Sequence, residues 1–325
     1  MNYLRLAITA LLLTITVAAV ASAPAINAHQ IALQKKAFIQ ALVTQHHFNR
    51  RQLTALLNSL RPDQRILNSM VKPMESKPWD YYRNFFLTPQ RITLGAKYMR
   101  NHHRELMAMQ KKYGIPASVI TAIIGVETQY GMHLGKFSVL RALYTLGFYY
   151  PPREKFFRKE LGQYLLLTRE NHLNPRSLKG SYAGALGIPQ FMPSSYRYYG
   201  VSSTPNKRVD LFTNNDAIVS VANYFYKMGW QANQPIVTQL PSRYEAEKSE
   251  IKMLSLPRKN YMEYWAVYSN FNVIMSYNHN IVYVMAVYEL SKAIEERYDN
   301  AKNARETGRR MASSSRKLHR RQSTV

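Results

Sequence analysis

The sequence contains no cysteine in its 325 residues. Disulfide bonds, a thiolate nucleophile, a Cys-ligated zinc site and a lipid anchor attached through an N-terminal Cys are therefore excluded. No GxSxG elbow marks a serine hydrolase, no HExxH pair marks a zinc protease, and no GK[ST] sequence marks a phosphate loop. His46-His47 and His102-His103 are adjacent pairs and lack the HExxH spacing of a zinc site, so we interpret them as core or surface residues. No metal and no other cofactor is expected.

Acidic residues are scarce: 19 Asp and Glu face 44 Lys and Arg, for a formal net charge of +25. Such a protein attracts polyanions. Nucleic acid would be the default partner in the cytosol, whereas an exported protein meets acidic cell-wall polymers and anionic lipid surfaces. Because a basic surface also simply keeps a protein soluble, charge alone does not choose between recruitment and solubility.

Long apolar runs are confined to the N-terminus. Arg5 precedes an apolar segment from Leu6 to Val20, and small residues follow. This is the layout of a secretory signal peptide, which we predict over residues 1–28 with cleavage after Ala25 or Ala28. No later run reaches the roughly 20 apolar residues of a membrane span. The sequence therefore predicts an exported protein that is soluble after cleavage.

Apolar residues at helical spacing predict a mainly helical fold. Asn49 should cap a helix over 50–60, and Thr88-Pro89 should start one that ends near Gly114. Residues 61–87 look irregular, and short apolar runs between about 232 and 275 predict a few strands or an irregular subdomain. From residue 301 to 325, basic residues with few apolar ones predict a disordered tail. Further helices are expected from Pro116 to about 130 and over 138–147, 152–170, 214–228 and 280–297.

Glu127, in the segment GVETQYG, is the strongest candidate for catalysis. It is the only carboxylate within roughly twenty residues on either side. It falls near the C-terminal end of an apolar helix, where burial and the helix dipole both disfavour the ionised form. A side chain that keeps its proton near neutral pH is what a general acid needs. The alternative is a structural Glu held by an Arg or by backbone donors.

Residues 180–193, GSYAGALGIPQFMP, offer a surface for a polymer. Their small side chains let a ligand approach the backbone closely. Gln190 adds an amide for hydrogen bonding and Phe191 a ring for sugar stacking. A tight helix-packing segment is the alternative interpretation. Taken with Glu127, the pattern indicates an enzyme that cleaves a glycan.

A second catalytic carboxylate is hard to find. Glycoside hydrolysis ordinarily needs two. Glu154, Glu160 and Glu170 fall on a polar helical pattern and should be solvated, while Asp210 and Asp216 lie in or beside a loop. One acid suffices if the 6-hydroxyl of N-acetylmuramic acid (MurNAc) attacks its own anomeric carbon, because intramolecular reactions reach effective molarities of about 10^5 M or more.

Four segments in order carry a resemblance to a known family: GVETQYG, SYAGALGIPQFMPSSY (181–196), DAIVSVANYFYKMGW (216–230) and SYNHNIVYVMAVYEL (276–290). Together they resemble the membrane-bound lytic murein transglycosylase B family, in a soluble form, over roughly residues 30–297. The resemblance implies a periplasmic enzyme with a lysozyme-like helical domain and a smaller mixed subdomain. It also implies cleavage of the bond from MurNAc to N-acetylglucosamine (GlcNAc) in peptidoglycan, with 1,6-anhydro ring formation.

By position, Glu127 matches the family's catalytic acid/base. The predicted organisation is a signal peptide at 1–28, a catalytic domain at 29–300 and a disordered basic tail at 301–325. Within the catalytic domain we expect a lysozyme-like core at about 88–230, a mixed segment at about 232–275 and a closing helix at 280–297. The expected partners are peptidoglycan strands, and other cell-wall enzymes or anionic surfaces through the basic tail, but not nucleic acid. A water-using muramidase and a non-catalytic wall-binding protein are the alternatives to the transglycosylase function.

The positions that match the family's glycan-contacting residues are Ser181, Gln190, Phe191, Tyr224, Tyr277 and Asn278, and less closely Tyr82 and Arg153.

Two departures from the family pattern stand out. The family often carries an EF-hand-like calcium loop after the PSSY segment, but residues 202–213 here read SSTPNKRVDLFT. Lys207 and Arg208 would repel a cation, so calcium is not expected, and Asp216 is explained by helix-terminal stabilisation. The second departure is Pro152, where a basic residue would be usual. It leaves Arg153 alone for a peptide or lactyl carboxylate.

Overall fold

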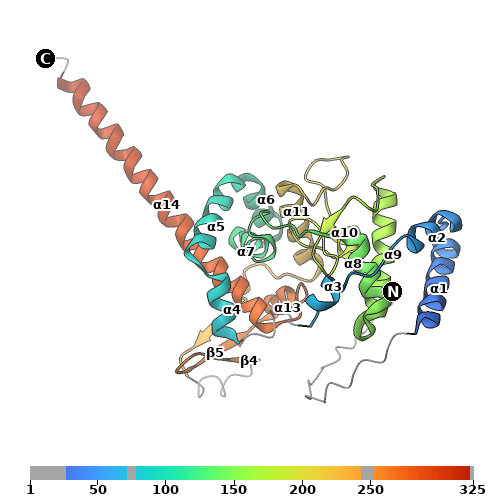
Figure 1. Ribbon diagram of the computed structural model, residues 1–325. Coiled ribbons are helices and arrows are strands. Elements are labelled where there is room, and N and C mark those ends of the chain that lie inside the picture. The colour runs from blue at the N-terminus through green and yellow to red at the C-terminus, as the bar shows by residue number, and fades with distance from the viewer. Residues whose placement is uncertain (1–26, 72–77, 243–251, 323–325) are drawn as a thin grey trace, which may run out of the picture.

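The computed structural model describes residues 27–71, 78–242 and 252–322 (Figure 1). Helices dominate these residues and two small antiparallel sheets complete the fold, so the predicted class, mainly α with a minor β part, is confirmed. The signal peptide predicted over 1–28 lies almost entirely outside the described residues.

The helices follow the predicted order along most of the chain. Within the part that the structure describes, no helix has both the length and the apolar character needed to cross a bilayer. The helices are α1 (Ala28–His46), α2 (Arg50–Asn58), α3 (Gln64–Ser69), α4 (Trp79–Phe86), α5 (Pro89–Asn101), α6 (His103–Tyr113), α7 (Ala117–Thr128), α8 (Val139–Tyr149), α9 (Glu154–Glu170), α10 (Pro193–Tyr199), α11 (Asn214–Lys227), α13 (Ser269–Met275) and α14 (Ile281–Gln322), with a 3₁₀ turn, η2 (Pro151–Arg153).

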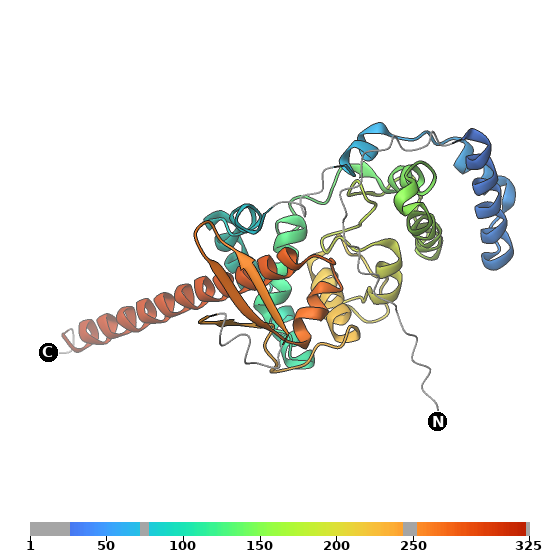
Figure 2. The ribbon, with the colours of Figure 1, turned by 90° about the horizontal axis from the view of Figure 1, so that it is seen from below.

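The two predicted helix caps are confirmed. The side chain of Asn49 accepts a hydrogen bond from the Gln52 backbone N at 3.0 Å, and Thr88 accepts one from the Arg91 N at 3.2 Å. Each satisfies a backbone donor that the first turn of a helix leaves unpaired. α1 and α2 stand to one side of the molecule, where α1 packs against α8 (Figure 2).

α7 lies at the centre of the fold, in contact with α5, α6, α11 and α14. Its sequence is apolar on nearly every side, and all of its side chains except Val126 and Glu127 are buried. A helix that is apolar all round belongs in a core. The last turn of α7 is therefore a rigidly held position.

Three strands lie within residues 232–275, where short apolar runs predict them, although the end of that segment forms the helix α13. β3 (Val237–Leu240), β4 (Met253–Pro257) and β5 (Met262–Val267) form an antiparallel sheet in the order β3-β5-β4. A second pairing joins β1 (Phe137–Ser138) to β2 (Lys179–Gly180). This short pairing ties the start of the small-residue loop 180–191 to the segment that follows α7.

Two helical details differ from the expectation. Residues 61–87, expected to be irregular, contain two short helices, α3 and α4. Asp63 caps α3 by accepting from the Arg65 N, and α4 forms because Trp79, Tyr82 and Phe86 share one face and are buried. The helix expected from Thr88 to Gly114 is broken at His102, whose φ is −115°, into α5 and α6. Apolar spacing continues across the break and so does not reveal it.

The closing helix is longer than expected. α14 contacts α4, α5 and α7 and then projects beyond the body to Gln322 (Figure 1). This differs from the disordered tail predicted over 301–325. The segment lacks proline and is rich in Ala, Arg and Lys, which favour helix even without a core to pack on.

Candidate active site

α7 ends abruptly after Glu127 and Thr128. Gln129, Tyr130 and Gly131 follow with φ of 50°, 63° and 85°, all in the left-handed region. For a residue with a side chain this conformation costs about 1 kcal/mol or more, so surrounding contacts must hold it. The Tyr130 hydroxyl supplies one by donating to the Arg91 carbonyl at 2.8 Å. The backbone beside Glu127 is therefore fixed in an unusual turn.

Gly125 makes this turn sterically feasible. Tyr130 folds back over the end of α7, and a Cβ at Gly125 would lie 2.7 Å from its ring. Any larger residue would push that ring away. The glycines at both ends of GVETQYG thus serve the geometry around Glu127.

Glu127 is half-buried and receives a hydrogen bond from α14. The Tyr283 hydroxyl donates to Glu127 Oε1 at 2.6 Å. Burial, followed by the nearby charge of Glu127, raises the pKa of Tyr283 well above its usual value. Tyr283 thus keeps its proton and remains a donor, which orients the carboxyl. The sequence analysis missed Tyr283, because a Tyr at helical spacing in an apolar run is typical of a core.

Three of the predicted glycan-contacting residues meet beside this pair. The ring centre of Tyr277 lies 5.0 Å from that of Tyr224, 5.7 Å from that of Phe191 and 6.5 Å from that of Tyr283. Phe191 and Tyr224 are buried, whereas Tyr277 is partly exposed. The Phe191 ring, which we predict to contact sugar, packs on Tyr224 and Tyr277.

The hydroxyls of this aromatic cluster fix the surrounding backbone. Tyr277 donates to the Pro189 carbonyl at 2.5 Å, and Tyr224 donates to the Ser276 carbonyl at 2.7 Å. Burial raises the pKa of both tyrosines, so both stay protonated donors. The cluster thereby joins α11, the end of α13 and the small-residue loop.

The small-residue loop folds tightly on itself. Ser181 Oγ accepts from the backbone N of Ala183 at 3.2 Å and of Ala185 at 3.0 Å. Gln190 donates to the Gly187 carbonyl at 2.8 Å. A Cβ at Gly187, whose φ is +71°, would lie 2.6 Å from the Leu211 carbonyl oxygen. At this position glycine is required by the packing of the protein itself.

Thr128 connects the loop to the candidate acid. Its hydroxyl donates to the Ile188 carbonyl at 2.8 Å. Because Thr128 directly follows Glu127, the loop is anchored one residue from the carboxyl. The structure thus brings together the two segments that the sequence analysis singled out.

The remaining predicted residues lie at different distances from this centre. Tyr82 is buried in α4, which packs against α14. Asn278 is half-buried in the connection from α13 to α14. Arg153 lies in η2, which packs on α8 and α9, with its guanidinium 4.5 Å from the Phe156 ring centre. Tyr82 thus lies on a helix that contacts the helix of Tyr283, while Arg153 packs on a ring of α9.

The other candidate carboxylates have partners elsewhere. Glu154 pairs with Arg158 at 2.8 Å, and Glu170 pairs with Arg197 at 2.6 Å. Glu160, predicted to be solvated, is in fact buried and accepts from the Ser194 N and Oγ at 2.9 and 2.7 Å. Helical spacing could not reveal this, because the donors lie 34 residues away on α10.

A protein whose helical core presents one such carboxyl beside a small-residue loop falls in the class of lysozyme-like lytic transglycosylases. The chain belongs to the family described as "Transglycosylase SLT domain", which it matches over residues 31–292. It is 34% identical to membrane-bound lytic murein transglycosylase B of Escherichia coli K12, over 79% of this chain and 81% of that protein.

Solved structures of lytic transglycosylases are similar to this chain and agree with its assignment to the family. The structure of the E. coli lytic transglycosylase SLT35 in complex with bulgecin A matches with a TM-score of 0.75 and 33% identity, over 81% of this chain and 93% of that one. The soluble lytic transglycosylase SltB1 of Pseudomonas aeruginosa, in its catenated form, matches with a TM-score of 0.76 and 36% identity, over 82% and 98%.

SLT35 has also been solved in complex with calcium. In this chain, the loop at 202–213 contains Lys207 and Arg208 and is closed by Asp216. Both carboxylate oxygens of Asp216 are engaged: Oδ1 accepts from the Ser203 N and Oγ at 2.8 and 2.6 Å, and Oδ2 from the Asp210 N at 2.8 Å. Among the described residues, no three acidic or His side chains gather to hold a metal. The residues of this loop do not fit a calcium site, and Asp216 closes the loop directly.

Proposed function

We propose that the protein is a peptidoglycan lytic transglycosylase that cleaves the MurNAc-β-1,4-GlcNAc bond and leaves 1,6-anhydro-MurNAc ends, with Glu127 as its single acid/base. The observation that carries the proposal is the Tyr283 hydrogen bond to Glu127 at the anchored end of α7. It holds one carboxyl in a fixed orientation while the other candidate carboxylates are engaged elsewhere.

The proposed reaction needs only this carboxyl. The protonated Glu127 donates its proton to the glycosidic oxygen, and the bond from the MurNAc anomeric carbon to that oxygen breaks. The MurNAc 6-hydroxyl oxygen then bonds to the anomeric carbon and gives its proton to the Glu127 carboxylate. Glu127 ends as it began, and no water is consumed. Such intramolecular attack is favoured because its effective molarity reaches about 10^5 M or more.

The roles of the surrounding residues follow from their contacts. Tyr283 is a positioning residue, because it holds Glu127 Oε1. Tyr277, partly exposed beside Glu127, and the loop residues Ser181 and Gln190 are proposed to contact the glycan, with Phe191 and Tyr224 shaping the wall behind Tyr277. Asn278, Tyr82 and Arg153 are proposed as more peripheral contacts.

The proposed location is the periplasm after removal of the predicted signal peptide. The net charge of +25 favours contact with acidic wall polymers there, including contact through the basic end of α14. The proposed partners are therefore peptidoglycan strands and other anionic components of the wall.

A Glu127→Gln variant tests the proposal. Gln keeps the shape and can still accept from Tyr283, but it cannot transfer a proton. Release of soluble fragments from purified peptidoglycan should fall by at least the roughly 10^2 to 10^4 typical of general acid catalysis. An unchanged circular dichroism spectrum is the control for folding. Wild-type activity in this variant would reject Glu127, and reducing ends in the wild-type products would favour the water-using muramidase.

A further inference from the structure

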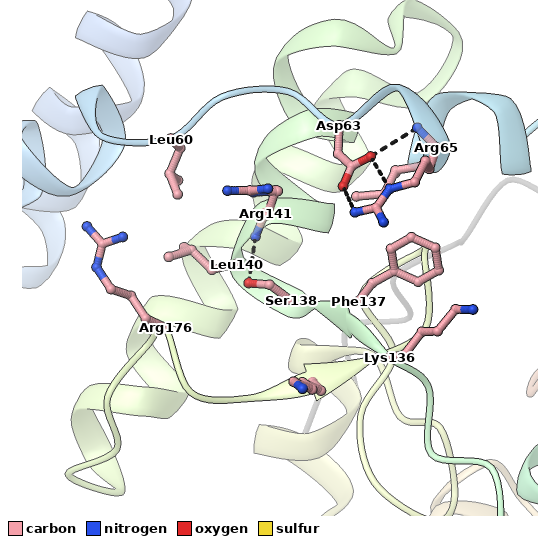
Figure 3. Close-up of a pocket in the computed structure, with 11 residues that line it drawn as sticks. Leu60, Asp63, Arg65, Lys136, Phe137, Ser138, Leu140, Arg141 and Arg176 are labelled. Carbon is pink, nitrogen blue, oxygen red and sulfur yellow. Dashed lines mark hydrogen bonds and ion pairs between the residues drawn. The ribbon is translucent and has the colours of Figure 1, made fainter.

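A basic cavity of about 440 Å³ lies between the linker that follows α2 and the β1–β2 pairing (Figure 3). Its walls come from segments far apart in the chain: the linker and α3, the end of the turn after α7, α8, and the strand that leads into the small-residue loop. The charged residues that line it are Arg65, Lys136, Arg141, Arg176, Lys179 and Asp63.

The one acidic side chain in this lining is already paired. Arg65 forms a two-point ion pair with Asp63, at 2.6 Å from Nη2 to Oδ2 and 3.0 Å from Nε to Oδ1. These bonds, with a smaller contribution from Arg141, lower the pKa of Asp63 and keep it ionised. The lining therefore offers no second carboxylate to pair with the other basic side chains, which are those of Lys136, Arg141, Arg176 and Lys179.

Those basic side chains are exposed at the cavity. Arg176 donates to the neutral Ser59 hydroxyl at 2.6 Å. In the described part of the chain, Lys136, Arg141 and Lys179 form no ion pair. The cavity thus carries positive charge that an anion can neutralise.

The cavity also has an apolar side. The apolar residues in its lining are Leu60, Ile66, Phe137 and Leu140. A short peptide with free carboxylates suits this mixture, because its carboxylates can pair with Arg and Lys while its alkyl groups cover the apolar side chains. A phosphodiester polymer offers the charge but lacks alkyl side chains for the apolar side.

The cavity adjoins the proposed active-site loop. Lys179 pairs with Ser138 in the β2–β1 ladder, and Ser181 follows two residues later, within about 7 Å along even a fully extended chain. A ligand attached to a glycan that contacts Ser181 would therefore be held near Lys179.

We infer that this cavity binds the acidic stem peptide of the glycan strand through Lys136, Arg141 and Lys179. The inference rests on the proposed function, because it assigns the cavity to the same substrate. It adds a recognition site for the peptide branch, separate from the sugar contacts around Glu127.

Binding of the peptide alone tests the inference. A synthetic stem tetrapeptide with free carboxylates, without sugar, is titrated calorimetrically into the Glu127→Gln protein. Adding Lys136→Gln and Lys179→Gln should weaken binding about three- to tenfold, the size expected for two partly screened charge contacts. Lys97→Gln with Lys207→Gln removes two exposed charges outside the cavity and is the matched control, with a change below about twofold. Arg141→Gln is an independent third variant, expected to weaken binding in the same direction.

Two results would overturn the inference. Equal weakening by the cavity pair and the control pair would mean that only the overall charge matters. Binding of a short poly(glycerol phosphate) as tight as that of the peptide would assign the cavity to phosphate polymers. Fragment release by the wild-type enzyme from peptide-bearing and peptide-free strands is measured in parallel. If neither kind of strand released fragments, the proposed function would be contradicted. The titration would still measure whether the cavity binds the peptide.

Discussion

The Tyr283 hydroxyl lies 2.6 Å from Glu127 Oε1, although 156 residues separate the two in the chain. The contact joins the buried end of α7 to the first turn of α14. A carboxyl held in this way meets a substrate in one orientation, which matters because a positioned proton donor is more effective than a mobile one.

Replacing Tyr283 with Phe tests this positioning role. Loss of the hydrogen bond should lower kcat about ten- to hundredfold, because Glu127 becomes a carboxylate as it gives up its proton and bonds to a charged group are worth about 1.5–3 kcal/mol. KM should change little, since Tyr283 is buried behind the carboxyl. Tyr298→Phe is the control: Tyr298 lies on the same helix as Tyr283, its exposed hydroxyl contacts His103 of α6, and the variant should retain full activity. A normal kcat in Tyr283→Phe would contradict the role.

Glu160 should matter for stability. Ser194→Ala removes the hydroxyl bond to the buried Glu160 carboxylate, so the free energy of unfolding should fall by about 1–3 kcal/mol in urea titrations. Glu170→Gln, which breaks the more exposed pair with Arg197, should cost less than about 1 kcal/mol. Equal losses in the two variants would argue against a special role for the buried site.

Asp63 should contribute to stability in a pH-dependent way. Its folded-state pKa is lowered, chiefly by the side-chain bond from Arg65, so its contribution is present above the unfolded pKa of about 3.9 and is lost as the pH falls through the folded value. Asp63→Asn can retain the helix cap but loses the charge. We expect it to be less stable than wild type by about 0.5–1 kcal/mol at pH 7, and the gap to close below about pH 4.

Urea midpoints measured from pH 3 to 7 would show this closing gap. Asp299→Asn, at an exposed position on α14, is the matched control and should show no comparable loss at pH 7. A gap for Asp63→Asn that stays constant to pH 3 would be inconsistent with an electrostatic contribution.

The loop closed by Asp216 should make stability independent of calcium. Adding millimolar calcium or a chelator should shift the melting temperature by less than about 1 °C. Asp216→Asn should lower the free energy of unfolding by about 1–3 kcal/mol, because the donors from Ser203 and Asp210 lose the charged acceptor that the buried Asp216 side chain provides. A calcium-dependent rise in the melting temperature would show that the loop binds the ion after all.

Local signals predicted much of this fold. The caps at Asn49 and Thr88 and the buried helix before Glu127 depend on residues close together in the sequence, and each is confirmed. The helical break at His102 was missed because side-chain spacing continues through it. The extension of α14 was missed because the composition argument considered the lack of a core and not helix propensity.

The site was predictable only in part. Motif order identified Glu127 and the loop at 181–191, which the structure anchors to each other through Thr128 and Ile188. Tyr283 and Glu160 were not identified, because their roles depend on partners contributed by distant segments. A buried Tyr and a Glu on a polar pattern look ordinary until the fold brings Glu127 and Ser194 beside them.

The most direct test of the single-carboxyl mechanism is digestion of purified peptidoglycan by the wild-type enzyme in water labelled with heavy oxygen, followed by mass spectrometry of the released fragments. Attack by the MurNAc 6-hydroxyl predicts fragments with 1,6-anhydro ends that contain no heavy oxygen. Reducing ends that carry the label would show that water is the nucleophile and would contradict the mechanism.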